Sequence, residues 1–160
     1  MALDPRELRN TLGNFTTGVC LVTALDRARQ AQALTVNSFS SVSLDPPLVL
    51  WSLQNNSEVF DVFATPQHYA INVLSAEQEA LSVRYAQPGA HRLEPAHFTP
   101  GENGAPVISG ALAHFECDLA ATHEGGDHTI IVGRVTRFAA DTGRDPLVFY
   151  RGGYRALAVS

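Results

Sequence analysis

The most informative segment of this chain is Thr35-Val36-Asn37-Ser38-Phe39-Ser40-Ser41-Val42-Ser43-Leu44-Asp45-Pro46-Pro47-Leu48-Val49. Its first ten residues are rich in short hydroxyl and amide side chains and carry no charge. Such a segment offers hydroxyls and backbone N–H groups to a ligand. This chemistry suits a flat polar ring system with a phosphate tail. A Ser-rich turn between strands that satisfies only its own backbone is the alternative.

A second cluster of small polar residues, Ser52 to Ser57, comes just beyond the apolar run Leu48 to Leu53. That run is short and continuous, which predicts a buried strand. The two polar clusters therefore flank one strand and could converge on a single anion. We expect a ligand site here, with self-satisfied turns as the competing interpretation.

The bulk composition is that of a globular protein and predicts one domain over residues 1–160. The chain is 45% hydrophobic and 17% charged, unlike a disordered segment. Its net charge of −5 argues against a broad nucleic-acid-binding face. No apolar run approaches the roughly 20 residues of a membrane span. The first residues lack the pattern of a secretion signal, so we expect a cytoplasmic protein.

Several catalytic classes are excluded by residues or motifs that the chain lacks. All 11 basic residues are Arg, which removes Schiff-base chemistry on Lys and the Walker A motif. Neither G-x-G-x-x-G nor G-x-S-x-G occurs, so a Rossmann turn and a nucleophile elbow are not expected. The two cysteines, Cys20 and Cys117, lie in apolar stretches and are predicted to be buried, reduced and structural.

The pattern of apolar residues predicts about six strands and two or three helices. Helices are expected from Asp4, with Leu8, Leu12 and Phe15 on one face, after Ser57, and from the capping box of Ser75 and Gln78 to about Ala86. Strands are expected at residues 19–24, 48–53, 69–74, 111–119, 129–135 and 146–150. Strand follows strand in the C-terminal half, which favours an antiparallel barrel over a parallel α/β sheet.

Residues 87–106 are rich in Pro, Gly and His and show little periodicity. This pattern predicts a long surface loop, and loops of this length often serve in binding. We expect His91, Arg92 and His97 to lie in solvent there.

Four further residues are individual candidates with two interpretations each. His123 and His128 superficially resemble a zinc-protease helix, but they are five positions apart and two glycines intervene, so no metal site is predicted. A hairpin turn would deliver His128 to a strand, either as a turn residue or as a site residue. Arg84 either binds a phosphate through its positive charge or is a solvated surface residue. Tyr154 lies either on a flexible tip that closes over a ligand or in a plain C-terminal turn.

Taken together, these segments resemble the short-chain flavin reductase family, the reductase partners of two-component flavin monooxygenases. The resemblance covers nearly the whole chain. It rests on Phe15 to Val19, Leu34 to Val49, Tyr69 to Ser75, Gly126 to Val135 and Pro146 to Tyr154. The central segment, followed at that distance by Gly126-Asp127-His128, is the specific combination.

The resemblance implies a mainly β protein with short helices, an FMN-binding split β-barrel with antiparallel, Greek-key-like strands. It implies a homodimer with FMN or FAD near the subunit interface. The implied reaction is hydride transfer from NADH or NADPH to the flavin, which then serves a separate oxygenase. A protein that binds flavin or carries electrons without turnover is the alternative.

The resemblance also implies roles for individual residues. The ring edge would be lined by Thr35, Val36, Asn37, Ser38 and Phe39, and the phosphate would be held by Ser40, Ser41, Ser57 and Arg84. Ser52 and Leu53 would contact the ring or the ribityl chain, with Asn55 grouped among the cofactor-binding residues, and His128 and Tyr154 would shape the nicotinamide side. The chain departs from the family at Ala33, where Gly is common, and at His91-Arg92-Leu93, so cofactor preference stays open.

Overall fold

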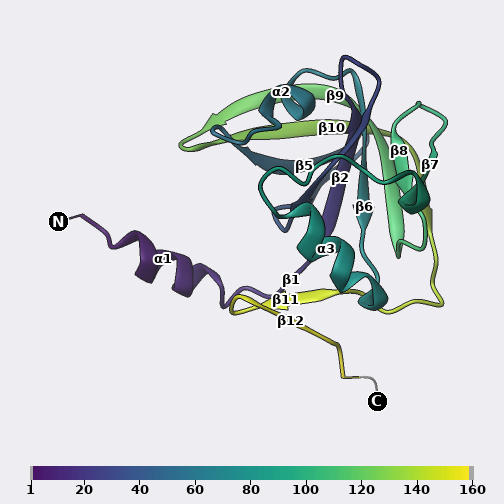
Figure 1. Ribbon diagram of the computed structural model, residues 1–160. Coiled ribbons are helices and arrows are strands. Elements are labelled where there is room, and N and C mark those ends of the chain that lie inside the picture. Colours follow the sequence, from purple (N-terminus) through teal and green to yellow (C-terminus); the bar gives the residue numbers. More distant parts are fainter. Residues whose placement is uncertain (1, 159–160) are drawn as a thin grey trace.

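The computed structural model describes residues 2–158, in which strands predominate and helices are short (Figure 1). The helices are α1 (Pro5–Leu12), α2 (Phe60–Ala64) and α3 (Glu79–Tyr85), with 3-10 turns η1 (Ala76–Gln78) and η2 (Pro95–His97). The strands are β1 (Thr17–Gly18), β2 (Cys20–Leu25), β3 (Ala31–Val36), β4 (Ser40–Leu44), β5 (Pro47–Gln54), β6 (His68–Val73), β7 (Phe98–Pro100), β8 (Pro106–Ile108), β9 (Ala113–Gly125), β10 (His128–Ala140), β11 (Val148–Tyr150) and β12 (Gly153–Arg155).

One sheet of seven strands organises the molecule, in the order β3-β2-β6-β9-β10-β5-β4. Every neighbouring pair in it is antiparallel, which confirms the expected strand arrangement. The longest strands, β9 and β10, form a hairpin that turns at Gly126, whose φ is +72°. Glycine adopts this conformation without the steric cost that a side chain would carry. The hairpin brings His128 beside Gln54 of β5.

The expected number of strands is wrong, because more strands are present than the six predicted. Five of the additional or shortened ones, β1, β7, β8, β11 and β12, are only two or three residues long. Alternation between two faces cannot be recognised over so few residues. Two of them, β7 and β8, form a small separate sheet with each other, and the other three form a second one.

The core consists of two apolar clusters on opposite faces of β2. Trp51 packs edge-on against Phe63 and Tyr69, with ring centroids 5.8 and 6.3 Å apart, in one cluster. Leu21 and Tyr85 belong to the other, which lies toward α3. Residues on both faces of β2 are therefore buried, Thr23 included, whereas burial alternates along β5.

Both cysteines lie in this interior, as expected. Cys20 and Cys117 are buried and unpaired. Burial raises the pKa of each thiol to about 12, so both stay protonated at neutral pH.

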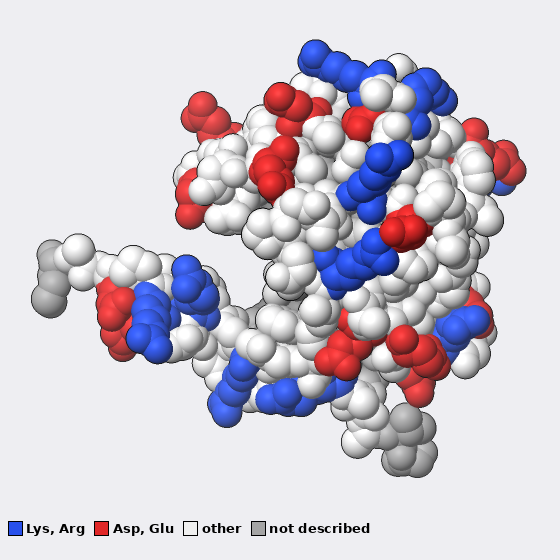
Figure 2. Space-filling model, viewed as in Figure 1, with Lys and Arg blue, Asp and Glu red and all other residues white. Residues whose placement is uncertain are grey.

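Helix α1 stands apart from the body of the molecule (Figures 1 and 2). Asp4 caps it by accepting a hydrogen bond from the Arg6 N–H at 2.8 Å, as the sequence predicts. No residue of the helix is buried. Leu12 is 65% exposed, and Phe15 just beyond the helix is 78% exposed. The predicted apolar face is therefore confirmed for Leu8 and Leu12 but is wrong for Phe15, because the helix ends at Leu12. These side chains have no partner that buries them within the described part of the chain. None of the helices in residues 2–158 has the length and apolar character needed to cross a membrane.

The prediction of a solvated loop over residues 87–106 is wrong in part. The segment contains η2 and β7 and reaches β8. His91 and Leu93 are buried, because the segment between them lies along the edge of β3, with hydrogen bonds in both directions to Ala31 and Ala33. Backbone groups that find partners on a strand edge can be buried without cost, which composition alone does not reveal.

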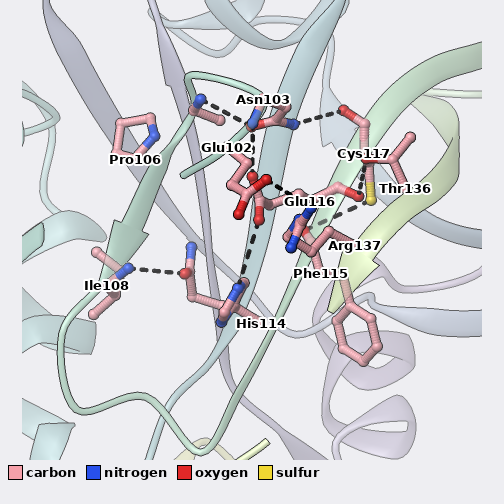
Figure 3. A network of polar contacts seen from close by, with 12 residues as sticks. Glu102, Asn103, Pro106, Ile108, His114, Phe115, Glu116, Cys117, Thr136 and Arg137 are labelled. Carbon is pink, nitrogen blue, oxygen red and sulfur yellow. Dashed lines mark hydrogen bonds and ion pairs between the residues drawn. The ribbon is translucent and has the colours of Figure 1, made fainter. Parts of the chain in front are cut away.

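Glu116 on β9 is a buried carboxylate, although alternation groups it with the polar face of the strand. Its side chain accepts a hydrogen bond from the Asn103 N–H at 2.8 Å, and the His114 Nε2 atom lies 3.8 Å away (Figure 3). Asn103 also donates to the Cys117 carbonyl oxygen at 3.4 Å. This network attaches the turn between β7 and β8 to the sheet, so the carboxylate has a structural role.

Gly133 on β10 is required by a close approach of Tyr69. A Cβ atom at this position would overlap the Tyr69 hydroxyl and contact the Cys117 side chain. The Tyr69 ring therefore extends from β6 to β10, where the missing side chain of Gly133 leaves room for it. This close packing leaves no space for a larger residue at position 133.

We expect Gly133→Ala to lower the free energy of unfolding by about 1–3 kcal/mol, because the added methyl group overpacks the core. Urea unfolding followed by Trp51 fluorescence measures the change. Gly18→Ala is the matched control, since a Cβ there meets no atom within 4 Å, and it should change stability by less than about 0.5 kcal/mol. Equal stability of the two variants would contradict this role of Gly133.

Candidate functional site

A polar cleft of about 200 Å³ opens where β3 ends beside β5 and the start of β10. The residues that line it are Leu34, Thr35, Val36, Asn37, Ser38, Ser52, Gln54, Ser57 and His128. The cleft thus combines the two polar clusters of the sequence, as expected from their position on either side of one strand. His128 is its one side chain that can carry a charge.

The two clusters are joined directly across the cleft. The Ser38 hydroxyl accepts a hydrogen bond from the Ser52 N–H at 2.9 Å. Because Ser52 lies on β5, this contact fixes the bend after β3 against a strand of the main sheet that is paired on both sides. The residues of the bend therefore present their backbone groups from a defined position, as a rigid binding site requires.

His128 reaches the cleft from a turn that Asn55 holds in place. The Asn55 side chain donates to the Gly126 carbonyl at 3.1 Å and accepts from the Thr129 hydroxyl at 2.7 Å. The His128 Nδ1 atom lies 2.6 Å from the Asp127 carboxylate. This hydrogen bond, reinforced by the charge of His128, lowers the pKa of Asp127. Asp127 thus orients the imidazole, and Asn55 holds the turn beneath it.

A second hollow, of about 230 Å³, lies on the other side of Thr35, Val36 and Asn37. These three residues line both spaces and form a wall between them, which we call the shared wall. The other residues lining the second hollow are Val19, Ser82, Ala86, Phe149 and Tyr154. Its lining is therefore aromatic and apolar, in contrast to the polar cleft.

Ser82 of α3 fixes both sides of the second hollow. Its backbone carbonyl accepts a hydrogen bond from the Thr35 hydroxyl at 2.7 Å. Its own hydroxyl lies 2.6 Å from the Tyr154 hydroxyl. Tyr154 also packs edge-on against Phe149, with ring centroids 5.4 Å apart. The aromatic side of the hollow is consequently held by side-chain contacts on two sides.

Not every residue expected at the site lies on these two surfaces. The structure brings seven expected residues to the polar cleft, namely Thr35, Val36, Asn37, Ser38, Ser52, Ser57 and His128, and it places Tyr154 at the second hollow. Phe39, Ser40, Ser41, Leu53, Asn55 and Arg84 line neither space.

Each of these exceptions has a visible physical reason. The Leu53 side chain points into the core and is fully buried, so any contact with a ligand would have to use its backbone. Phe39 stacks on Phe115 with centroids 5.5 Å apart. Ser40 and Ser41 are exposed on the edge strand β4.

Arg84 lies on the far side of α3 from the second hollow's lining. Its guanidinium forms an ion pair with Glu94 at 2.6 Å. This pair connects the helix to the loop that follows it. As an exposed pair it contributes little to stability.

Sequence reasoning missed several lining residues. Gln54 was detectable, because it lies two residues after Ser52 on a strand whose buried residues are Val49, Trp51 and Leu53. Ser82 was not, because it lies on a helix far away in sequence from the polar clusters.

The arrangement can hold one extended ligand, with its tail in the polar cleft and a flat ring along the shared wall beside the second hollow. The polar cleft offers neutral hydroxyls, amides and backbone N–H groups to an anionic tail, and the second hollow offers aromatic surface to a ring. No pair of carboxylates lines either space. The geometry suits positioning of two ligands better than acid–base catalysis.

Comparison with known proteins gives consistent matches. The family described as flavin reductase like domain matches residues 12–158. The FMN reductase (NADH) SmoA of Agrobacterium fabrum is 50% identical over 151 residues, covering 94% of this chain and 85% of the relative. HsaB, the reductase subunit of a flavin-dependent monooxygenase of Rhodococcus jostii, is 34% identical, with 98% and 80% covered.

A solved structure agrees with these sequence matches. The NADH:FAD oxidoreductase SgcE6 of Streptomyces globisporus C-1027, in complex with NAD and FAD fragments, superposes with a TM-score of 0.90 at 35% identity. The alignment covers 99% of this chain and 97% of that one. Some other matching proteins are longer, and the chain spans about half of their length.

Proposed function

Because this chain belongs to the flavin reductase like domain family, we propose that it is an NADH-dependent flavin reductase. NADH and a proton reduce FMN or FAD, and NAD⁺ and reduced flavin are released. A bound flavin supplies the hydride-accepting ring, and the protein supplies binding and orientation. The reduced flavin serves a separate oxygenase, as the name of the HsaB relative indicates for that protein.

The observation that carries this proposal is the shared wall of Thr35, Val36 and Asn37 between a polar and an aromatic space. The phosphorylated tail of a flavin fits the hydroxyls of Ser38, Ser52 and Ser57. Its ring then lies along the shared wall, and the nicotinamide stacks on the uncovered face of that ring, with His128 at the polar cleft and Tyr154 at the second hollow on either side. Holding both rings in contact is the main contribution of the protein to the rate.

The residues of the site act by position. Backbone groups of Thr35 to Asn37 orient the polar edge of the ring, and Ser38 keeps them fixed through its contact with Ser52. Tyr154 and Phe149 line the hollow with aromatic surface on which a ring can pack. Hydride transfer itself requires no protein acid or base, which agrees with the neutral lining.

The direct test of this function is consumption of NADH. We expect the absorbance of NADH to fall when FMN or FAD is added to the purified protein. If both flavins bind and NADH is not consumed under anaerobic conditions, the protein is a flavin carrier without turnover. Absence of flavin binding as well would contradict the whole proposal.

The position of the phosphate can be tested with one added charge. We expect Ser57→Asp to weaken flavin binding at least about tenfold, because the carboxylate repels the phosphate in the cleft. Fluorescence quenching of the flavin measures the Kd. Ser41→Asp adds the same charge on the exposed edge strand β4 and should leave the Kd within about twofold. If Ser41→Asp weakens binding and Ser57→Asp does not, the phosphate lies at β4.

We further propose that the sheet closes as a split β-barrel and that two copies form a homodimer. The support for the dimer is the uncovered apolar surface of Leu8 and Leu12 on α1 and of Phe15 just beyond it, on a segment that stands away from the rest of the chain. Burial of these side chains by a second copy would remove apolar surface from water. The unpaired Cys20 and Cys117 fit a reducing compartment, so we place the protein in the cytoplasm.

The dimer predicts a mass of two chains in sedimentation equilibrium at micromolar concentration. Leu12→Asp should convert it largely to one chain, because a charge cannot be buried there without a partner. Circular dichroism should remain that of the wild type, because no residue of α1 is buried within its own chain. A variant that keeps the mass of two chains would exclude α1 from the interface.

A further inference from the structure

The segment His91 to Leu93 is attached to β3 as an additional strand edge. The Ala33 N–H donates to the His91 carbonyl and the Leu93 N–H donates to the Ala31 carbonyl, both at 2.8 Å. The last residue of β3 that the segment contacts, Ala33, is two residues before Thr35, where the shared wall begins.

The imidazole of His91 joins two parts of the chain and is only 8% exposed. Its Nδ1 atom lies 3.1 Å from the Ala33 carbonyl oxygen, and its Nε2 atom lies 2.8 Å from the Glu58 carboxylate. The Gly89 N–H donates to the same carboxylate. Glu58 therefore connects the loop, the histidine and the turn before α2.

The partners determine the protonation of the ring. A backbone carbonyl can only accept, so Nδ1 carries a hydrogen. An ionised carboxylate also only accepts, so Nε2 of His91 carries one as well when the contact with Glu58 is made. Both contacts together require the positively charged imidazolium, held by charge-assisted hydrogen bonds.

The two partners lie next to the ligand-binding residues. Ala33 precedes Thr35 by two positions on β3, and Glu58 directly follows Ser57. The imidazolium thus ties together the two chain segments that face each other across the polar cleft. Its ring takes no part in lining that cleft.

We propose that His91 is a positioning residue that, when protonated, holds the Ser57 turn at a fixed place relative to the end of β3 and thereby sets the affinity for flavin. This role rests on the proposed function. The neutral ring has one hydrogen and cannot serve both acceptors, so one contact is lost and the Ser57 turn is released. The bridge therefore exists only while the ring carries a hydrogen on both nitrogens, and deprotonation at higher pH breaks it.

The charged groups around His91 make Glu58 its counter-ion. Among the described residues, Glu58 is the one carboxylate within ion-pair distance of the ring. Arg92 beside it in sequence is exposed. Other charged residues lie on the neighbouring elements. They are Asp26, Arg27 and Arg29 before β3, Asp61 on α2, Glu79 on α3, and the mutually paired Arg84 and Glu94.

The test measures the Kd for FMN and FAD at about pH 6 and about pH 8.5 in four proteins. Because the FMN phosphate changes its charge between these pH values, each variant is compared with the wild type at the same pH and with the same flavin. Glu58→Gln is the informative variant, since its amide can donate to the neutral ring and keep the bridge at both pH values. His68→Gln is the matched control, because it removes another histidine–carboxylate pair, with Asp118 at 2.6 Å, outside the cleft.

From pH 6 to pH 8.5, we expect the Kd of the wild type to rise by a factor about fivefold larger than that of Glu58→Gln. A fivefold effect is at the lower end of the coupling usually found between two sites. His91→Ala should weaken binding about fivefold at pH 6 and match the wild type within about twofold at pH 8.5. A merely structural histidine would weaken binding equally at both. His68→Gln should follow the wild type.

Two results overturn the inference while leaving the proposed function intact. One is a Glu58→Gln profile identical to that of the wild type, and the other is an equal loss in His91→Ala at both pH values. A wild type that binds neither flavin at either pH overturns the proposed function and this inference together.

Discussion

The site depends on the end of β3 being held in a fixed position. Thr35 is held by the backbone of Ser82 on one side, and Ser38 is held to Ser52 on the other. These contacts come from α3 and β5, elements that are packed on different apolar clusters. A backbone fixed from both sides presents its N–H and C=O groups without further ordering, which lowers the entropic cost of binding.

Much of the fold follows from the sequence, because long strands repeat their pattern often enough to be recognised. β5, β6, β9 and β10 are predicted by alternation or by apolar runs, and the capping box of Ser75 and Gln78 is formed. The short strands and the attachment of residues 91–93 are not predictable in this way. They depend on which backbone edges meet in three dimensions, and composition carries no information on that.

The site is predictable to the extent that it lies on one continuous segment. Thr35 to Ser38 and the cluster from Ser52 to Ser57 are close in sequence, which made a common cleft predictable, although β3 and β5 are not paired in the sheet. Leu53 shows the limit, because the period of two turns its side chain into the core when Ser52 faces the cleft. Ser82 and His91 reach the site through contacts with residues far away in sequence, for which no local signal exists.

The scarcity of charge in the cleft has a consequence for the exchange of its ligand. No guanidinium lines the cleft, and His128 is its one side chain that can carry a charge, so attraction to a phosphate rests largely on short-range hydrogen bonds, which ionic strength screens little. Long-range steering then accelerates encounter little, and departure is not slowed by a guanidinium–phosphate ion pair. Such a surface favours rapid exchange of reduced flavin for oxidised flavin, as suits a protein whose product is consumed by a second protein.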